Sequence, residues 1–586
     1  MNIIAVIGIV VTLVTAIPVL IQLRSHPRGL FILFFAEMWE RFSFYGMRGL
    51  LIFYLTQHFL FDDAFANGIY GAYMSLVYLL PLIGGFLADH YLGTRKAVAF
   101  GALLLVAGHA TMTIEGAPAT QTLTYQGASY DFQVEGRGNS RQVRILIGGQ
   151  AYEFGPAPEG AVEIRNLPAG APLPSVLAKD TYELSVRDRD PVYAGIFFLA
   201  LSLIVMGVGF LKPNISSLVG QLYPAADPRR DSGFTLFYYG INLGSFWAAI
   251  LCGYLGQVVG WWAGFGLASI GMAAGYVVFV MGKPMLEGKG EPPAKANLSK
   301  KIAGPVTLEA GIYGATILGL GVVWLFVQRF ELVGYALGAG SIAVLSYLFH
   351  FMWTKCTREE ASKMALALCL IAFSVIFFTL FNQAGSSLNQ FAQRNSELDV
   401  FGYSITPAQT GSFNAGFILL LAPLFAAIWA YLEPRHLDPN PPAKFGLALI
   451  QIAVGFAVLV WGAQNFASPE FKVPLVFLVV MYFFHTTGEL FLSPVGLSQM
   501  TRLSPPATVA TIMATWFLGS AWAGYVAALI AKLTAAPTLA GQVLDLGAAL
   551  QNYISVFTKV AMWGGALGLA ILVVSPILGR LLSNGK

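Results

Sequence analysis

Apolar stretches about twenty residues long recur from one end of this chain to the other. A helix of that length crosses the hydrocarbon core of a bilayer, whereas an outer-membrane barrel would show segments of roughly ten residues with strict alternation. Only 11% of the 586 residues are charged, less than half of the roughly 25% that is usual for soluble proteins. The sequence therefore predicts an all-α polytopic membrane protein and argues against a soluble multidomain enzyme.

The membrane helices are expected where apolar runs are bounded by glycine, proline or charge. The fifteen runs lie near residues 2–22, 30–56, 68–88, 97–114, 192–220, 233–255, 258–281, 305–327, 332–353, 363–390, 407–432, 443–463, 472–500, 508–533 and 552–581.

Lysine and arginine are distributed unevenly between the short loops. One set of alternate loops, with the C-terminus, holds nineteen of them and the opposite set holds five. The positive-inside rule places the first set in the cytoplasm. We therefore expect a multi-pass protein of the cytoplasmic (inner) membrane with its C-terminus inside and its N-terminus outside. The run 2–22 is followed by Arg24 and Arg28 rather than preceded by charge, which predicts an added helix instead of a signal peptide. A helix lying along the membrane surface is the alternative.

Residues 116–190 differ in composition from the rest of the chain. They contain sixteen charged residues, and short alternating segments such as 130–134 and 142–147 are separated by glycine-rich turns. This pattern predicts a small strand-rich insert, which the loop alternation places outside the cytoplasm. No catalytic constellation is visible in it, so an accessory or interaction role is the hypothesis for this segment.

The other helices divide into two sets of six. We expect an extra N-terminal helix in 1–25, a first bundle in 26–115 and 191–282, a linker with two additional helices in 283–362, and a second bundle in 363–586. Related halves with a binding site at their interface are a recurring design of transporters.

Charged residues inside the predicted spans are few, and the densest group lies in 30–56. Offsets of 3, 4, 8 and 11 from the first residue place five side chains on one helical face: Glu37, Glu40, Arg41, Tyr45 and Arg48. A charge at the bilayer centre costs ~2.5–3.5 kcal/mol on insertion scales, so such groups usually serve a polar cavity. An ion-pair network that only holds helices together is the alternative.

Two further charges lie within predicted spans, one on the fourth helix of each bundle. Lys212 precedes Pro213, which should kink its helix, and Glu489 lies at the corresponding place in the second half. We expect the two to face each other across a central cavity, although Lys212 could also reach the cytoplasmic interface. Tyr238, Asn242 and Asn414 add polar groups to the expected cavity wall.

At these positions the sequence resembles the proton-coupled oligopeptide transporter family of the major facilitator superfamily. Its E-x-x-E-R-F-x-Y-Y-G signature is matched by Glu37, Glu40, Arg41, Phe42, Tyr45 and Gly46, and its F-Y-x-x-I-N-x-G-S signature by Phe237, Tyr238, Ile241, Asn242, Gly244 and Ser245. Residues 85–96 resemble a loop motif of the superfamily. The resemblance implies the major facilitator fold of two six-helix bundles, with the extra helix pair found in bacterial members.

The resemblance also implies roles for individual residues. Arg41 and Lys212 would face the peptide carboxylate, Glu489 would face the peptide amine, and Glu37, Glu40 and Glu489 would be protonation sites, with Arg41 and Lys212 taking part in coupling. Backbone contacts would come from Tyr45, Tyr78, Asn242 and Asn414, side-chain pockets from Tyr238 and Trp516, and support for Glu489 from Ser493. Arg48 resembles the arginine of the outer gate and would also border the substrate.

Two departures from the family pattern stand out. Phe44 occupies the place of the first of two tyrosines, and Asn382 occupies the place of the acid that would pair with Arg48. Asn382 can offer a hydrogen bond but no ion pair, so the sequence casts doubt on an outer gate that is switched by charge.

The expected function is import of di- and tripeptides driven by protons, with protons as coupling ion and no other cofactor. A transporter of another small solute, such as an amino acid, nitrate or an organic anion, is the alternative. An intramembrane enzyme is disfavoured because H-E-x-x-H, G-x-S-x-G and paired intramembrane aspartates are missing from the sequence. Three scattered cysteines suggest no metal site, the net charge of +4 suggests no nucleic-acid partner, and we expect a functional monomer in the lipid bilayer.

Overall fold

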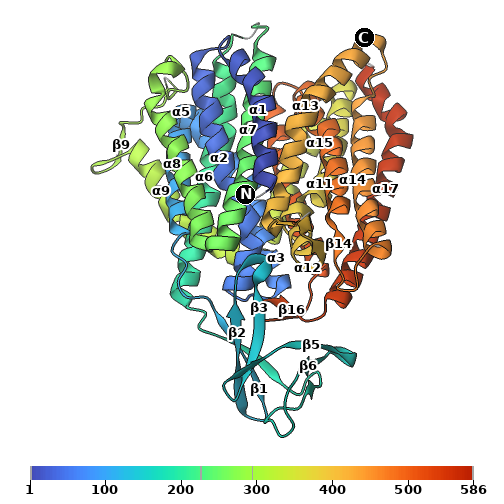
Figure 1. Cartoon of the computed structure of the whole chain (residues 1–586). Helices are drawn as coiled ribbons and strands as arrows, with labels where there is room; N and C mark the ends of the chain where they lie inside the picture. Colours follow the sequence, from blue (N-terminus) through green and yellow to red (C-terminus); the bar gives the residue numbers. More distant parts are fainter. Residues whose placement is uncertain (1–2, 225–226, 294, 401, 584–586) are drawn as a thin grey trace.

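Two helical bundles lie side by side in the computed structural model, with a β-rich part at one end and the C-terminus at the other (Figure 1). The structure describes residues 3–224, 227–293, 295–400 and 402–583. The N-terminal bundle consists of α2 (Arg28–Phe53), α3 (Asp63–Leu79) continued by α4 (Pro81–Leu87), α5 (Thr94–Thr111), α6 (Pro191–Gln221), α7 (Arg230–Tyr254) and α8 (Trp261–Met281).

The C-terminal bundle repeats this arrangement. It consists of α11 (Arg358–Phe381) followed by the short α12 (Ser387–Asn395), then α13 (Ser412–Leu432), α14 (Pro441–Asn465), α15 (Leu475–Leu503), α16 (Val509–Leu533) and α17 (Leu546–Ser583). Short turns of 3-10 or π type extend several helices, among them η1 (Tyr54–His58), η2 (Ala88–Leu92), η5 (Leu255–Val259), η7 (Asn382–Gly385) and η8 (Pro407–Gly411).

Thirteen helical segments in the described part of the chain are long and apolar enough to cross a membrane. The other two expected spans are helical as α2 and α5 but are not among these thirteen, and α2 carries the charged stripe. The chain is thus a multi-pass membrane protein with an all-α membrane part.

Close contacts between the helices depend on small residues. This is usual in membranes, because lipid tails are as apolar as the helix surfaces and the hydrophobic effect does not drive the helices together. α4 and α6 cross at Gly84, where a Cβ atom would overlap the carbonyl oxygen of Gly209. Only glycine fits at that crossing, which fixes the position of α6 and therefore of Lys212.

Among the long helices of the described residues, three stand outside the two bundles. α1 (Ile3–Leu23) lies lengthwise along α7, where the Trp247 indole donates to Thr12 Oγ1 over 2.9 Å and Thr15 Oγ1 lies 2.8 Å from the Tyr239 hydroxyl. α9 (Leu308–Gln328) packs on α6, and α10 (Phe330–Thr354) packs on α16. α9 is thus attached to the N-terminal bundle and α10 to the C-terminal bundle, while α1 lies along the N-terminal bundle.

The insert between α5 and α6 folds into two antiparallel sheets. The larger has the strand order β4-β3-β2-β1-β8 and the smaller has β5-β6-β7. The strands are β1 (Thr120–Tyr125), β2 (Ala128–Glu135), β3 (Gln142–Ile147), β4 (Gln150–Tyr152), β5 (Phe154–Ala157), β6 (Ala161–Ile164), β7 (Val176–Leu177) and β8 (Glu183–Arg187).

The apolar core of the insert is shared with the C-terminal bundle. Leu123, Ile145 and Val162 of the insert cluster with Leu539 and Ala540, which belong to a hairpin between α16 and α17, formed by β15 (Thr538–Leu539) and β16 (Gln542–Val543). The remaining strand pairs are short: β9 (Lys301–Ala303) with β10 (Val306–Thr307), β11 (Ser396–Glu397) with β14 (Val473–Pro474), and β12 (Asp399–Val400) with β13 (Tyr403–Ser404).

Candidate substrate-binding site

The charged stripe of α2 forms a buried ion-pair cluster in the N-terminal bundle. Arg41 Nε lies 2.7 Å from Glu37 Oε1 and 2.9 Å from Glu40 Oε2. The helical spacing of four and one residues brings the three groups together, and the exposed fractions of Glu37, Glu40 and Arg41 are 1%, 0% and 6%. One guanidinium thus serves two carboxylates, so any ligand that attracts Arg41 must release one of them.

Lys212 lies close to this cluster on α6. Its Nζ is 4.0 Å from the ring centroid of Tyr78, a cation–π contact. α6 continues through Pro213 as one helix, and no carboxylate is within ion-pair distance of Lys212 in the part of the chain that the structure describes. The ammonium group is therefore available to an anion.

Glu489 of α15 is held by an amide from α13. Asn414 Nδ2 donates to Glu489 Oε2 over 3.2 Å and to Thr486 Oγ1 over 3.0 Å. Ser493 was expected to support Glu489, but among the described side chains it makes no hydrogen bond to this carboxylate. Asn414, which sequence reasoning assigned to the substrate, thus also positions the carboxylate.

A cavity of about 180 Å³ lies between the two bundles. Six of the predicted site residues line it: Tyr45, Arg48, Tyr238, Asn242, Asn414 and Glu489. The others do not form its wall, namely Glu37, Glu40, Arg41, Tyr78, Lys212, Asn382, Ser493 and Trp516. Glu489 therefore faces the cavity as expected, but Lys212 does not meet it there.

The predicted outer gate is arranged differently from the expectation. Arg48 Nε donates to the Tyr70 hydroxyl over 2.6 Å, and within the described residues it makes no hydrogen bond to Asn382. Arg48 also lies 5.6 Å from the ring centroid of Tyr45. Its partner is thus a phenol on α3 rather than the amide that follows α11.

A buried ion pair between the bundles was not identified from the sequence. Arg394 of α12 donates from Nη1 and Nη2 to the two carboxylate oxygens of Asp63 on α3, each over 2.7 Å. Gln390 donates to the same carboxylate and accepts from Asn67. Asp63 and Arg394 lie near helix ends, where charged residues are common, so neither stands out in the sequence. The signal that would have identified them is their contact with each other, and they are more than three hundred residues apart in the sequence.

Metal ligation finds no support in the described residues, since no three His, Cys, Asp or Glu side chains gather there. The cavity instead is lined by one cation from the N-terminal bundle, Arg48, and one carboxylate from the C-terminal bundle, Glu489, together with aromatic and amide side chains.

The chain is similar to known transporters over most of its length. The sequence profile described as "POT family" matches residues 95–548. The "Uncharacterized transporter YclF" of Bacillus subtilis is 31% identical, with 87% of this chain and 88% of the relative covered. The "Dipeptide and tripeptide permease B" of Xenorhabdus bovienii is 28% identical over 95% of both chains.

Solved structures agree with this similarity. A crystal structure of a peptide transporter POT variant in complex with alafosfalin is 31% identical, covers 95% of this chain and 96% of its own, and has a TM-score of 0.70. A POT family transporter in complex with 5-aminolevulinic acid is 25% identical with a TM-score of 0.69, and 94% of this chain and 97% of that chain are covered. With its two six-helix bundles and matching profile, the chain belongs to the POT family of transporters.

Proposed function

We propose that this protein is a proton-driven symporter that imports di- and tripeptides by alternating access. The observation that carries the proposal is the cavity between the bundles, into which Glu489 projects from one side and Arg48 from the other. The relatives named as dipeptide and tripeptide permeases support the same substrate class.

A short peptide is a zwitterion whose two charged ends are separated by a backbone common to all sequences. Glu489 would bind the amine, while Arg41 and Lys212 would attract the carboxylate once the cavity extends toward them. Tyr45, Tyr78, Asn242 and Asn414 would contact the backbone of the peptide, and Tyr238 and Trp516 would line the pockets for its side chains. Because these contacts ignore side-chain identity, we expect broad specificity.

Coupling to protons follows from the shared guanidinium of Arg41. When a carboxylate of the substrate attracts Arg41, Glu37 or Glu40 loses its counter-ion, and protonation removes the cost of an unpaired buried charge. Protonation at Glu489 would compete with binding of the peptide amine in the same way. Each exchange alters contacts at the bundle interface and so shifts the balance between the two access states.

Contacts join the two bundles at the end next to the insert. Asp63 and Arg394 join them, and Gln257 accepts from the Ala408 amide over 2.9 Å. We infer an outward-closed state, with the insert outside the cell, the C-terminus in the cytoplasm and the N-terminus outside. The charge distribution of the loops supports this orientation in the inner membrane, and we propose a lipid-embedded monomer with the domain limits given above.

Proton-gradient-driven uptake of labelled dialanine into proteoliposomes tests the proposal. We expect Glu40→Gln and Glu489→Gln to abolish accumulation against a gradient, because neither amide can carry the proton. Glu359→Gln is the matched control, since Glu359 is an exposed partner of Lys363 and its loss should leave uptake unchanged. Uphill accumulation at the wild-type level in both cavity variants would refute the proposal.

A second candidate, transport of a small amino-acid zwitterion, is favoured by the complex of a structural relative with 5-aminolevulinic acid. Competition decides between the two. Inhibition of dialanine uptake by 5-aminolevulinic acid without its own accumulation would favour peptides, and accumulation of labelled 5-aminolevulinic acid at the higher rate would favour the second candidate.

A further inference from the structure

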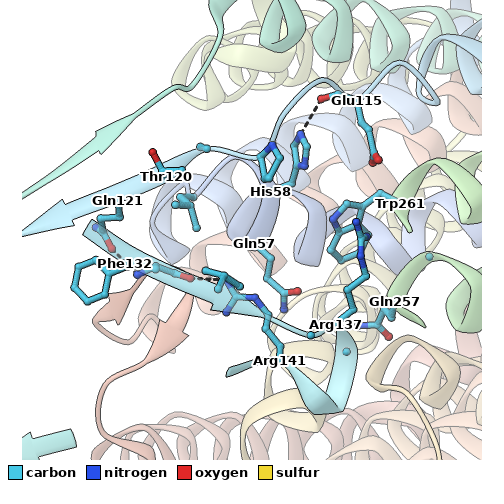
Figure 2. Close-up of a pocket in the computed structure, with 18 of the residues that line it drawn as sticks. Gln57, His58, Glu115, Thr120, Gln121, Phe132, Arg137, Arg141, Gln257 and Trp261 are labelled. Carbon is cyan, nitrogen blue, oxygen red and sulfur yellow. Dashed lines mark hydrogen bonds between the residues drawn. The ribbon is translucent and has the colours of Figure 1, made fainter. Parts of the chain in front are cut away.

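A second polar pocket lies outside the membrane part, between the insert and both bundles (Figure 2). Its volume is about 360 Å³. The insert contributes Arg137 and Arg141, the N-terminal bundle contributes His58 and Trp261, and the hairpin of the C-terminal bundle contributes Ala540. The pocket is therefore assembled from three parts of the chain and is separate from the central cavity.

Arg141 is the central feature of this pocket. It donates from Nη2 to the carbonyl oxygen of Ala540, and no carboxylate lies within ion-pair distance of it in the described ranges. Burial lowers the pKa of the Arg141 guanidinium to about 10, which leaves the group charged at neutral pH. A desolvated cation without a counter-ion is unfavourable, and an anion in the pocket would correct this.

The remaining charges of the pocket leave an excess of positive charge. Arg137 also has no ion-pair partner among the residues described, and Glu115 is the single acid of the lining. Glu115 Oε2 is buried and accepts no hydrogen bond in the described structure. Burial raises the pKa of Glu115, and nearby Arg137 and a hydrogen bond from the Trp262 backbone oppose this shift. The pocket thus holds two guanidinium groups and one carboxylate. Because Glu115 lies near Arg137, Arg141 is left without a counter-ion.

We propose that this outer pocket binds the carboxylate of a small solute through Arg141, and that the solute is a short peptide of the transported class. The identity of the solute depends on the proposed function, whereas the carboxylate chemistry does not. A guanidinium presents several N–H donors in a planar fork that suits a carboxylate. The amine of a peptide would be accepted by Glu115, and the ring of Trp261 borders the space between them.

Occupation of the pocket should also hold the insert in place. Asn139 donates to the Ile405 carbonyl over 2.9 Å, and Gln121 accepts from the Ala540 amide. The base of the insert is attached to the other bundle, because Arg189 donates to the carbonyl oxygens of Phe59 and Leu60. Separation of the bundles at their outer ends must break one set of contacts and open the pocket, so a bound solute favours the outward-closed state.

Protection of a cysteine inside the pocket tests the inference. Thr120 lines the pocket and is exposed, so Thr120→Cys is made in full-length protein whose Cys356 and Cys369 are serine, and its modification by a neutral thiol reagent is timed in nanodiscs. The probes are dialanine, dialanine amide and propionate. Ser129→Cys, on an exposed part of the insert, is the control cysteine.

We expect dialanine to slow modification of Thr120→Cys at least threefold, while dialanine amide has no effect and Ser129→Cys is unchanged. Protection by propionate as well would identify any small carboxylate as the ligand, and failure of propionate would restrict the site to peptides. Equal protection by dialanine amide, or no protection by either carboxylate, overturns the inference. All probes are compared on the same cysteine variant, so a difference between them does not arise from a difference in protein stability.

Variants at the pocket give an independent check. Arg141→Gln should raise the concentration of dialanine needed for half-protection at least tenfold, Arg141→Lys should raise it less, and Arg144→Gln should leave it unchanged, since Arg144 pairs with Glu135 on the same sheet. Unaltered protection in Arg141→Gln overturns the inference. Proton-driven uptake is measured in parallel: uptake without protection rejects only the outer site, and protection without uptake rejects the proposed transport function.

Discussion

The ion pair between Asp63 and Arg394 makes a quantitative prediction about the outer end of the protein. Asp63 accepts from both terminal nitrogens of Arg394, from Gln390 over 3.2 Å and from the Ala536 amide over 3.0 Å. The side chains of the pair are 1% and 6% exposed. Asp63→Asn removes the charge and leaves the buried Arg394 guanidinium with neutral partners only, the amide oxygen at position 63 and the Tyr553 hydroxyl.

The magnitude follows from the cost of an unpaired buried charge. Removing one partner of a buried ion pair costs ~3–5 kcal/mol, and this cost applies only while the bundles are closed, because water reaches Arg394 when they separate. At about 1.4 kcal/mol per tenfold change, Asp63→Asn should shift the equilibrium toward the outward-open state by roughly a hundredfold or more. We also expect slower peptide accumulation, since each cycle must close the outer end.

The distance between spin labels at Ile114 and Asn465 reports this shift, because Ile114 follows the C-terminal end of α5 and Asn465 is the last residue of α14. Double electron–electron resonance should show a longer distance between the labels in Asp63→Asn. The double variant Asp63→Arg and Arg394→Asp, which exchanges the two charged residues, should partly restore the shorter distance. Asp438→Asn is the control, since Asp438 pairs with Lys444 inside one bundle. A distance distribution in Asp63→Asn that matches the wild type would refute the reasoning.

Three further substitutions have defined outcomes. Asn414→Ala removes the hydrogen bond that orients Glu489; hydrogen bonds to charged groups contribute about 1.5–3 kcal/mol, so the KM for dialanine should rise roughly tenfold or more, and an unchanged KM would contradict this role. Gly84→Val places side-chain atoms against the Gly209 carbonyl, so the Tm of the purified protein should fall, whereas a Tm equal to the wild type would show that the crossing can widen. Arg95→Gln removes a partly exposed ion pair of ~0–1 kcal/mol, so uptake should change less than twofold, and abolished uptake would show that this contact is required.

The spans and the insert were predictable from the sequence because both depend on local composition. Hydropathy identified α2 even though it carries Glu37 and Arg48, since the apolar residues around them still fill a membrane length. Alternation in 142–147 predicted what is now strand β3, and glycine-rich turns separate it from its neighbours. Period and length are properties of short segments, so no tertiary information was needed.

The candidate site was predictable in part for the same reason. Glu37, Glu40 and Arg41 meet because helical spacing alone brings them together. The expectation that Lys212 faces Glu489 depended on how the two bundles are inclined, which spacing does not encode, and the two are not paired in this closed arrangement. The pairing of Asp63 with Arg394 likewise depends on tertiary structure.

The shared core of the insert has a consequence for the order in which the protein is made. Leu539 and Ala540 complete an apolar cluster whose other members are synthesised about four hundred residues earlier. Until α16 and α17 have been inserted, part of that cluster stays uncovered and is open to proteases and chaperones. The cluster is therefore complete only after both bundles have been inserted into the membrane and have packed together. Resistance of the insert to proteolysis would report this completed assembly.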